Sequence, residues 1–355
     1  MRRLSRHLGS SVFSAISITL LVIVGLDAVA AIIDEADSIR RNYRFVDLLI
    51  YVATTLPSRI YEYIPLSCLV GCLFGLGQLA NDSELIVIRA AGVSTLRIVS
   101  FVLRPALIFV FAGLLLGEYF APYLDQLAKG QREYLRKGES APDSSSGLWI
   151  REGREFMHFN AVFPGGVLFG VTRYKFSEDS QLSEASFASR ATYNNVSKYW
   201  VEENISITRF YPERTEIDKL VTRKWNSELS PQLLLVNVLP PDGLSTSTLY
   251  YYINFLKQQG TDSAIYQLAF WEKVLQPLII VGLIVLGIAF VFGPLRSSTI
   301  GLKIFVGVIV GIVFNIIQDM LGPSSIVMGF SPFMAVVMPI VICLLTGLYL
   351  LRRGR

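Results

Sequence analysis

Long apolar runs at both ends of the chain constrain its fold more than any other feature. Each run holds about 20 residues, the length that a helix needs to cross about 30 Å of hydrocarbon. Only 17% of the 355 residues are charged, against about a quarter in soluble domains. A lone strand would leave backbone groups unpaired in lipid. The sequence therefore predicts six transmembrane helices, over residues 12–33, 64–80, 98–120, 274–292, 300–320 and 330–350.

The segment between the first two predicted spans differs from both. Residues 45–63 are amphipathic and contain Pro57, Arg59 and Glu62, so we expect them to lie at or just outside the membrane interface and to lead into the second span. The basic residues 1–7 precede an apolar run, as in a signal peptide. That run lacks a convincing cleavage site and continues for about 20 residues, which favours an uncleaved span.

The middle of the chain reads as an aqueous domain. Apolar and polar residues alternate over 171–176 and 205–208, the period of a half-buried strand, and turn clusters at 164–166 and 177–180 separate such runs. We expect a β-sandwich or a jelly-roll-like pair of sheets over residues 138–252, inserted between membrane parts 1–137 and 253–355. Short helices are expected to flank it over 124–137 and 247–259.

Positive charges near the span ends indicate the orientation. Lys and Arg collect at the N-terminus, between spans two and three, between spans four and five, and at the C-terminus. With six spans, these four regions lie on one side of the membrane, and the positive-inside rule makes that side cytoplasmic. The β domain then faces the opposite side, which is the periplasm in a bacterium with two membranes.

A short polar segment, Asn81–Ser94, lies between spans two and three and carries helix signals. Asp82 or Ser83 can cap a helix start, and Gly92 suits the position after its end. Glu84 suits the positive end of the helix dipole. We expect one cytoplasmic helix, residues 83–91, which is either a coupling helix that transmits motion from a soluble motor or a surface helix lying on the headgroups.

The predicted short helix has an apolar face formed by Leu85, Ile86 and Ile88. Such a face requires a cover, and either lipid or a groove on a partner would provide it.

The sequence contains no recognisable catalytic or nucleotide-binding motif. A G-x-x-x-x-G-K-[ST] run is absent, so any ATPase that drives this protein is a separate chain. His7 and His158 are too isolated to suggest a metal site, and Cys68, Cys72 and Cys343 read as buried apolar residues. We expect no catalytic residue and no bound metal or cofactor in this chain.

Polar side chains inside predicted spans are candidates for a functional site. They are Asp27, Glu118, Asn315, Gln318 and Asp319. Interhelical hydrogen bonds or contact with interfacial water are favoured over a proton relay.

Basic residues on the outer side form a possible rim for an anionic headgroup. Lys129 and Arg132 are three apart, which places them on one helix face. Arg40, Arg41 and Arg44 lie on the same side of the membrane. Together they suit an anionic lipid headgroup, although physical chemistry alone favours a solvated charged face.

Further short motifs run along the chain. They are Pro65…Gly71…Gly75-Leu-Gly77…Leu79-Ala80, Ser83-Glu84-Leu85…Arg89-Ala-Ala-Gly92, Gly117-Glu118-Tyr-Phe-Ala121-Pro122, Gly147-Leu-Trp149, Gln276-Pro277 and Phe292-Gly-Pro-Leu-Arg296. Together they resemble the YjgP/YjgQ permease family nearly from end to end. The detail is closer to the paralogue of LptF than to LptF itself.

The resemblance implies one subunit of a lipopolysaccharide-exporting ABC transporter in the inner membrane of a Gram-negative bacterium. In such a complex an LptB-like ATPase dimer uses ATP to drive this chain and an LptF-like permease. The pair extracts lipopolysaccharide from the outer leaflet, and LptC-like and LptA-like proteins carry it across the periplasm. The family's aqueous domain is a periplasmic β-jelly roll, and both termini are cytoplasmic.

The resemblance also implies roles for individual residues. The family's coupling helix corresponds to a segment that contains Ser83, Glu84, Leu85 and Arg89, with Glu84 at the acidic position that contacts the ATPase.

Lys129 and Arg132 correspond to basic positions that face the headgroup. Some members carry lysines at the outer end of span one, where this chain has Ala31, Asp37 and Ser38. Arg40 and Arg41 are then expected to compensate from a shifted place.

Three alternatives stay open from the sequence. The first is that the chain is the LptF-type subunit itself, and the second is that it is a membrane assembly scaffold that does not transport. The third is an intramembrane enzyme that acts on lipid through Asp319 or Glu118.

Overall fold

The computed structural model describes residues 2–37, 39, 43–137, 148–163, 166–179, 181–227, 229–231, 234, 240–258, 262–295 and 298–353. The chain forms two compact units. The helical unit comprises Met1–Ala31, Leu56–Ala121 and Ser245–Arg355, and the sheet unit comprises Ile32–Thr55 and Pro122–Leu244. Three long helical segments, Arg3–Ala36, Phe45–Asn81 and Thr95–Arg132, continue from one unit into the other.

The described residues contain six helices that are long and apolar enough to cross a membrane, which confirms the predicted number. The candidate spans are Arg3–Ala36, Phe45–Asn81, Thr95–Arg132, Ala264–Phe292, Ile300–Met328 and Pro332–Arg353. The first three contain 34, 37 and 38 residues. At 1.5 Å per residue these three exceed the hydrocarbon thickness, so their ends extend beyond it.

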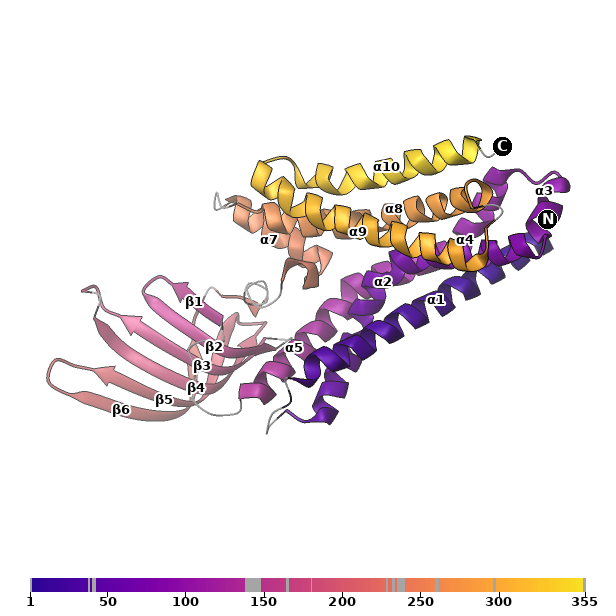
Figure 1. Ribbon diagram of the computed structural model, residues 1–355. Helices are drawn as coiled ribbons and strands as arrows, with labels where there is room; N and C mark the ends of the chain where they lie inside the picture. The colour runs from indigo at the N-terminus through magenta and orange to yellow at the C-terminus, as the bar shows by residue number, and fades with distance from the viewer. Residues whose placement is uncertain are drawn as a thin grey trace. The chain divides into compact units, whose positions relative to one another are not determined.

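The helical elements are shown in chain order in Figure 1. They are α1 (Arg2–Ala36), α2 (Phe45–Asn81), α3 (Glu84–Ala90), α4 (Thr95–Leu115), the π-helical turn η1 (Leu116–Phe120), α5 (Ala121–Lys137), the 3₁₀ turn η2 (Pro241–Gly243), α7 (Thr246–Gln258), α8 (Ala264–Phe292), α9 (Ile300–Met328) and α10 (Pro332–Arg353).

The amphipathic segment before span two is part of the same helix as that span. α2 runs without a break through Pro57 and Pro65. A proline removes only one backbone donor, and packing around a membrane helix can accommodate that loss. The expected interfacial segment is therefore the first half of one long helix.

Close contact with α1 depends on two glycines of α2. A Cβ atom on Gly71 would lie 2.5 Å from Cα of Ile16, and one on Gly75 would lie 3.0 Å from Cβ of Ala15. Only a residue without a side chain allows this approach, so the Gly-x-x-x-Gly spacing serves helix packing.

The centre of the helical unit is formed by α8 and α2. In the most apolar stretch of each helix, 72% of α8 and 67% of α2 is buried, but only 17% of α1 and 22% of α9. α1 and α9 therefore present most of their apolar side chains outward, where lipid or another membrane protein can cover them.

The sheet unit contains one described sheet of six antiparallel strands in sequence order, drawn as a curved layer in Figure 1. The strands are β1 (Leu148–Glu152), β2 (Glu155–Phe163), β3 (Val167–Phe176), β4 (Leu182–Asn194), β5 (Tyr199–Phe210) and β6 (Thr215–Trp225). The prediction of an antiparallel β domain is confirmed. Instead of two facing sheets, the described strands form a single sheet. The sequence could not predict this, because a two-residue period indicates strands but not how the strands divide into sheets.

The alternation of buried and exposed residues is interrupted along a line that crosses the sheet. Leu168, Ala191 and Trp200 are buried on one side of this line, and Val171 and Ala188 are buried on the other. Within β3 and β4 the buried residues on the two sides are therefore an odd number of positions apart, which breaks the two-residue alternation. The line passes through two residues with positive φ, Gly170 of β3 and Asn204 of β5.

Gly170 is required at this line. Its φ of +60° and the position of Asn160, whose Nδ2 would lie 2.2 Å from an added Cβ, both exclude a side chain. The second residue with positive φ on the line is Asn204 of β5, at +51°. Asparagine tolerates this conformation better than most residues.

A charged network crosses the inward face of the sheet. Glu202, 1% exposed, accepts hydrogen bonds from Arg173 at 3.0 Å and Arg223 at 2.7 Å. Glu155 also pairs with Arg173, and Glu184 with Arg223. Burial lowers the pKa of Arg223, but the hydrogen bonds and charges of Glu202 and Glu184 outweigh this and raise it above its ordinary value. The buried carboxylate is therefore held between two permanent cations.

We expect Glu202→Gln to lower the free energy of unfolding of the sheet unit by about 3 kcal/mol, because it leaves Arg173 and Arg223 without their shared buried anion. Glu178→Gln is the matched control, since its pair with Arg154 is exposed and contributes at most about 1 kcal/mol. Denaturant unfolding of the full chain, followed by tryptophan fluorescence, measures both. Equal losses in the two variants would contradict a stabilising network.

Candidate functional site

The predicted short helix between spans two and three is present as α3. It has seven residues and begins with Glu84. The expected side-chain cap is not made: Ser83 has a left-handed backbone with φ 62°, and its hydroxyl forms no capping hydrogen bond. Glu84 in the first turn still places negative charge at the positive end of the short helix.

The end of α3 follows the prediction for Gly92, which has φ +81°. The Gly92 N–H donates to the Arg89 carbonyl at 3.0 Å, and the Val93 N–H donates to the Ile88 carbonyl at 3.4 Å. These two bonds form a Schellman motif, which turns the chain sharply into α4.

The apolar side of α3 is covered by the chain itself. Leu85 and Ile88 are buried in the core of the helical unit, and the Arg89 guanidinium lies 5.7 Å from the ring centroid of Phe292. The expectation that lipid or a partner must cover Leu85 and Ile88 is therefore wrong. The side chain of Ile86 lies outside the described side chains.

The outward side of α3 is small and contains one large apolar side chain among those described. Val87 is 65% exposed, and Glu84 is partly exposed. α3 is therefore anchored in the core by Leu85 and Ile88 and exposes a small surface around Val87. Such a surface suits contact with another protein.

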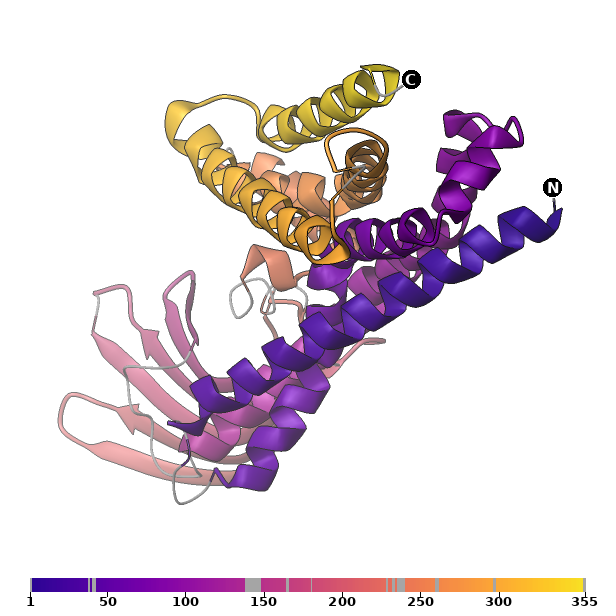
Figure 2. The same ribbon diagram turned by 45° about the vertical axis from the view of Figure 1, so that its right-hand side comes forward.

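A side-chain hydrogen bond that the sequence did not predict joins α3 to α1. His7 Nε2 lies 2.8 Å from Glu84 Oε2, and both side chains are about half exposed. In both views the N-terminal end of α1 lies beside α3 (Figures 1 and 2). The two residues are 77 apart in the sequence, and no local pattern links them.

The two predicted rim residues on α5 have different surroundings. Arg132 forms two hydrogen bonds with the Glu35 carboxylate, at 2.6 and 2.8 Å, and its guanidinium lies 5.4 Å from the Tyr51 ring centroid. Lys129 is partly exposed and forms no ion pair with any described residue. Arg40 and Arg41 lie outside the described residues.

Tyr43 is buried in the same unit as this pair. Burial, and then the charge of Glu35, raise the pKa of Tyr43 to about 12, with Arg132 opposing the shift. Tyr43 therefore keeps its proton at physiological pH. Its hydroxyl forms no hydrogen bond with any residue that the structure describes.

Asp27 and Glu118 are both engaged within the helical unit. Asp27 of α1 accepts a hydrogen bond from the Tyr63 hydroxyl at 2.8 Å and pairs with Arg59, both on α2. Glu118 accepts from two backbone N–H groups at the start of α7, at 2.9 and 3.2 Å. These contacts favour helix joining and capping over a proton relay.

The polar residues of α9 are arranged differently. Asn315 and Asp319 are exposed and four residues apart, so they share one outward helix face. Gln318 is partly buried. No group of three or more His, Cys, Asp or Glu in the described ranges is placed to hold a metal ion.

Comparison with known proteins gives a match over almost the whole chain. A family model described as "Lipopolysaccharide export system permease LptF/LptG" matches residues 6–353. The chain is 31% identical to the lipopolysaccharide export system permease protein LptG of Escherichia coli (strain K12), over 99% of this chain and 98% of the relative. It is 30% identical to the protein of the same name from Haemophilus influenzae (strain ATCC 51907 / DSM 11121 / KW20 / Rd), over 99% of each chain.

Replacement of the two rim residues should separate their roles. Arg132→Ala is expected to lower the free energy of unfolding by about 3 kcal/mol, because Glu35 would keep a buried charge without its partner. Lys129→Ala should change it by less than about 0.5 kcal/mol. Thermal unfolding of the full chain in micelles measures both. If Arg132→Ala unfolds at the temperature of the unmodified chain, the pair does not stabilise the fold.

Proposed function

Because the chain belongs to the lipopolysaccharide export system permease family LptF/LptG, we propose that it is a membrane-spanning subunit that extracts lipopolysaccharide from the outer leaflet of the inner membrane and passes it to a periplasmic bridge. The match over residues 6–353 carries this proposal, because it includes all six candidate spans and the sheet. The LptG relatives support the same branch for this chain, with an LptF-like chain as its partner.

The proposed orientation places both termini and α3 in the cytoplasm and the sheet in the periplasm. Arginines at both chain ends, together with Arg89 of α3 and Arg97 in the first turn of α4, support it through the positive-inside rule. α3 then lies where a cytoplasmic ATPase can reach it.

We assign α3 the role of coupling helix, contacted by an LptB-like ATPase dimer. Leu85 and Ile88 are buried in the same core as α1, α2, α4 and α8, so a displacement of α3 must move these helices or unpack the core. ATP is bound and hydrolysed by the ATPase, and this chain supplies no cofactor or catalytic group. Ser83, Glu84 and Val87 offer the accessible contact surface.

The lipid path uses surfaces of different chemistry. The outward apolar faces of α1 and α9 suit contact with acyl chains and with the second permease. On α5, Lys129 is the described cation that can meet a headgroup phosphate, since Arg132 is already neutralised by Glu35. LptC-like and LptA-like proteins receive the lipid from the sheet unit in the periplasm.

Glu84→Ala, in a complex co-expressed with its ATPase and second permease, should weaken ATPase co-purification or ATP-driven lipopolysaccharide release about tenfold. The expected loss is that of one charge-assisted hydrogen bond. Release from proteoliposomes into a soluble periplasmic acceptor measures the effect.

His7→Ala is the control for this experiment, because it breaks the pair with Glu84 but keeps the carboxylate. It should retain ATPase binding, as should Asp82→Ala, which removes an exposed neighbouring acid. Equal losses in the Glu84 and His7 variants would show that Glu84 acts only within this chain and would overturn its coupling role.

A further inference from the structure

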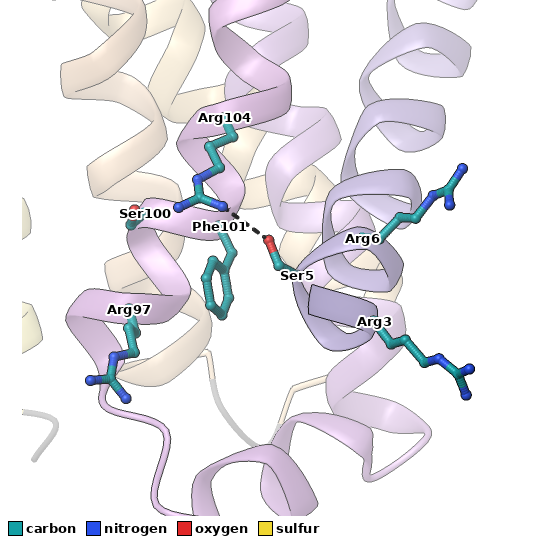
Figure 3. A pocket seen from close by; sticks show the side chains of 7 residues that line it. All are labelled: Arg3, Ser5, Arg6, Arg97, Ser100, Phe101 and Arg104. Atoms are coloured by element: carbon teal, nitrogen blue, oxygen red, sulfur yellow. Dashed lines mark hydrogen bonds between the residues drawn. The ribbon is translucent and has the colours of Figure 1, made fainter. Parts of the chain in front are cut away.

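A cavity of about 800 Å³ lies between the first turns of α1 and α4, and the proposed coupling and lipid path do not use it. It is lined mainly by basic and hydroxyl side chains, shown in Figure 3. The lining residues are Arg3, Ser5, Arg6, Arg97, Ser100, Phe101 and Arg104.

The two helices are in contact just beyond the cavity. An added Cβ on Gly9 would lie 4.0 Å from the ring of Pro105, and the Phe13 and Phe109 rings are 5.2 Å apart. These contacts and the Arg104–Ser5 hydrogen bond follow the same order along both helices. α1 and α4 are therefore parallel, and both begin at the cavity. Both helix dipoles therefore place their positive ends there.

The α4 side of the cavity is a single helix face. Its four lining residues, at positions 97, 100, 101 and 104, follow the i, i+3, i+4, i+7 spacing. Arg104 donates to the Ser5 hydroxyl at 3.4 Å and lies 5.5 Å from the Phe101 ring centroid. Figure 3 shows Arg97, Arg3 and Arg6 pointing away from the Arg104–Ser5 contact, at the edge of the cavity that they help to line.

The cavity has positive charge without a matching anion. None of the described residues that line it is acidic, and its four arginines form no ion pair with any part of the chain that the structure describes. Arg104 lies within a candidate membrane span. A cation in a membrane span is costly unless an anion accompanies it.

The surroundings indicate what kind of anion fits. Leu96, Leu107 and Ile108 on α4 are more than half exposed, as hydrocarbon-facing residues are. All four arginines are also exposed, so the cavity lacks the enclosed donors that would hold a small free phosphate. A ligand with a phosphate head and apolar tails matches both surfaces.

We propose that this cavity binds the headgroup of an anionic phospholipid, with Arg97 and Arg104 as its principal phosphate contacts. The orientation proposed above places it in the cytoplasmic leaflet, opposite the leaflet from which lipopolysaccharide is extracted. The lipid is therefore a resident of the permease and not its cargo.

The test uses the full chain alone, without ATPase or nucleotide, so its outcome does not depend on transport. Purified protein is stripped of lipid and incubated with phosphatidylglycerol or phosphatidylcholine, and bound lipid is counted by native mass spectrometry. We expect retention of phosphatidylglycerol, and a loss of affinity of about tenfold or more in the double variant Arg97→Gln/Arg104→Gln.

Two matched variants control for charge and folding. Arg352→Gln/Arg353→Gln removes the same charge from the end of α10 and should keep phosphatidylglycerol binding, while Arg97→Lys/Arg104→Lys keeps the charge and should retain most of it. Equal losses in the two glutamine variants would show a diffuse surface effect and overturn the site.

Two further outcomes would replace the lipid with another anion. Displacement of phosphatidylglycerol by millimolar inorganic phosphate alone would assign the cavity to free phosphate. If Arg97→Gln/Arg104→Gln keeps its lipid but loses a partner chain on purification of the whole complex, the cavity belongs to an acidic protein surface. Each of these results overturns the proposal.

Discussion

The bilayer interior has no water to bond backbone groups, and this constraint governs the rest of the structure. It requires each apolar run to be helical, and it removes the usual hydrophobic attraction between helices. Close contact must then come from shape. Gly71 and Gly75 allow the backbone of α1 to touch α2, and α8 occupies the centre of the helical unit. With α2 and α8 buried, α1 and α9 present most of their apolar side chains outward.

Charged groups in or near the spans follow the same constraint. Asp27 is bonded by two side chains of α2, and Arg132 is held by both oxygens of Glu35. These contacts join helices and leave little free charge. The arginines around the cavity between α1 and α4 are the contrast, because no described residue neutralises them. We therefore expect the counterions of these arginines to come from outside the chain, and the headgroup region supplies suitable anions.

The conformation of α3 depends on the parts of the chain around it. Seven residues are too few for a stable isolated helix, so its conformation depends on Leu85 and Ile88 in the core and on the turn at Gly92. The coupling role proposed for α3 relies on this dependence, because α3 cannot move without the helices on which Leu85 and Ile88 pack. The pair between His7 and Glu84 adds a link from α3 to the start of α1, one wall of the arginine cavity.

The sequence by itself determined the six spans, the existence of an antiparallel β domain and the turn at Gly92, because each has a local signal in hydropathy, alternation or residue type. Only the tertiary structure decided the single curved sheet, since the inward phase changes within its strands and periodicity cannot follow such a change. It also decided which charges are engaged. His7 and Glu84 are 77 residues apart, and Glu35 and Arg132 are 97 apart. Pairs at such separations form only when distant helices pack, and they leave no pattern along the chain.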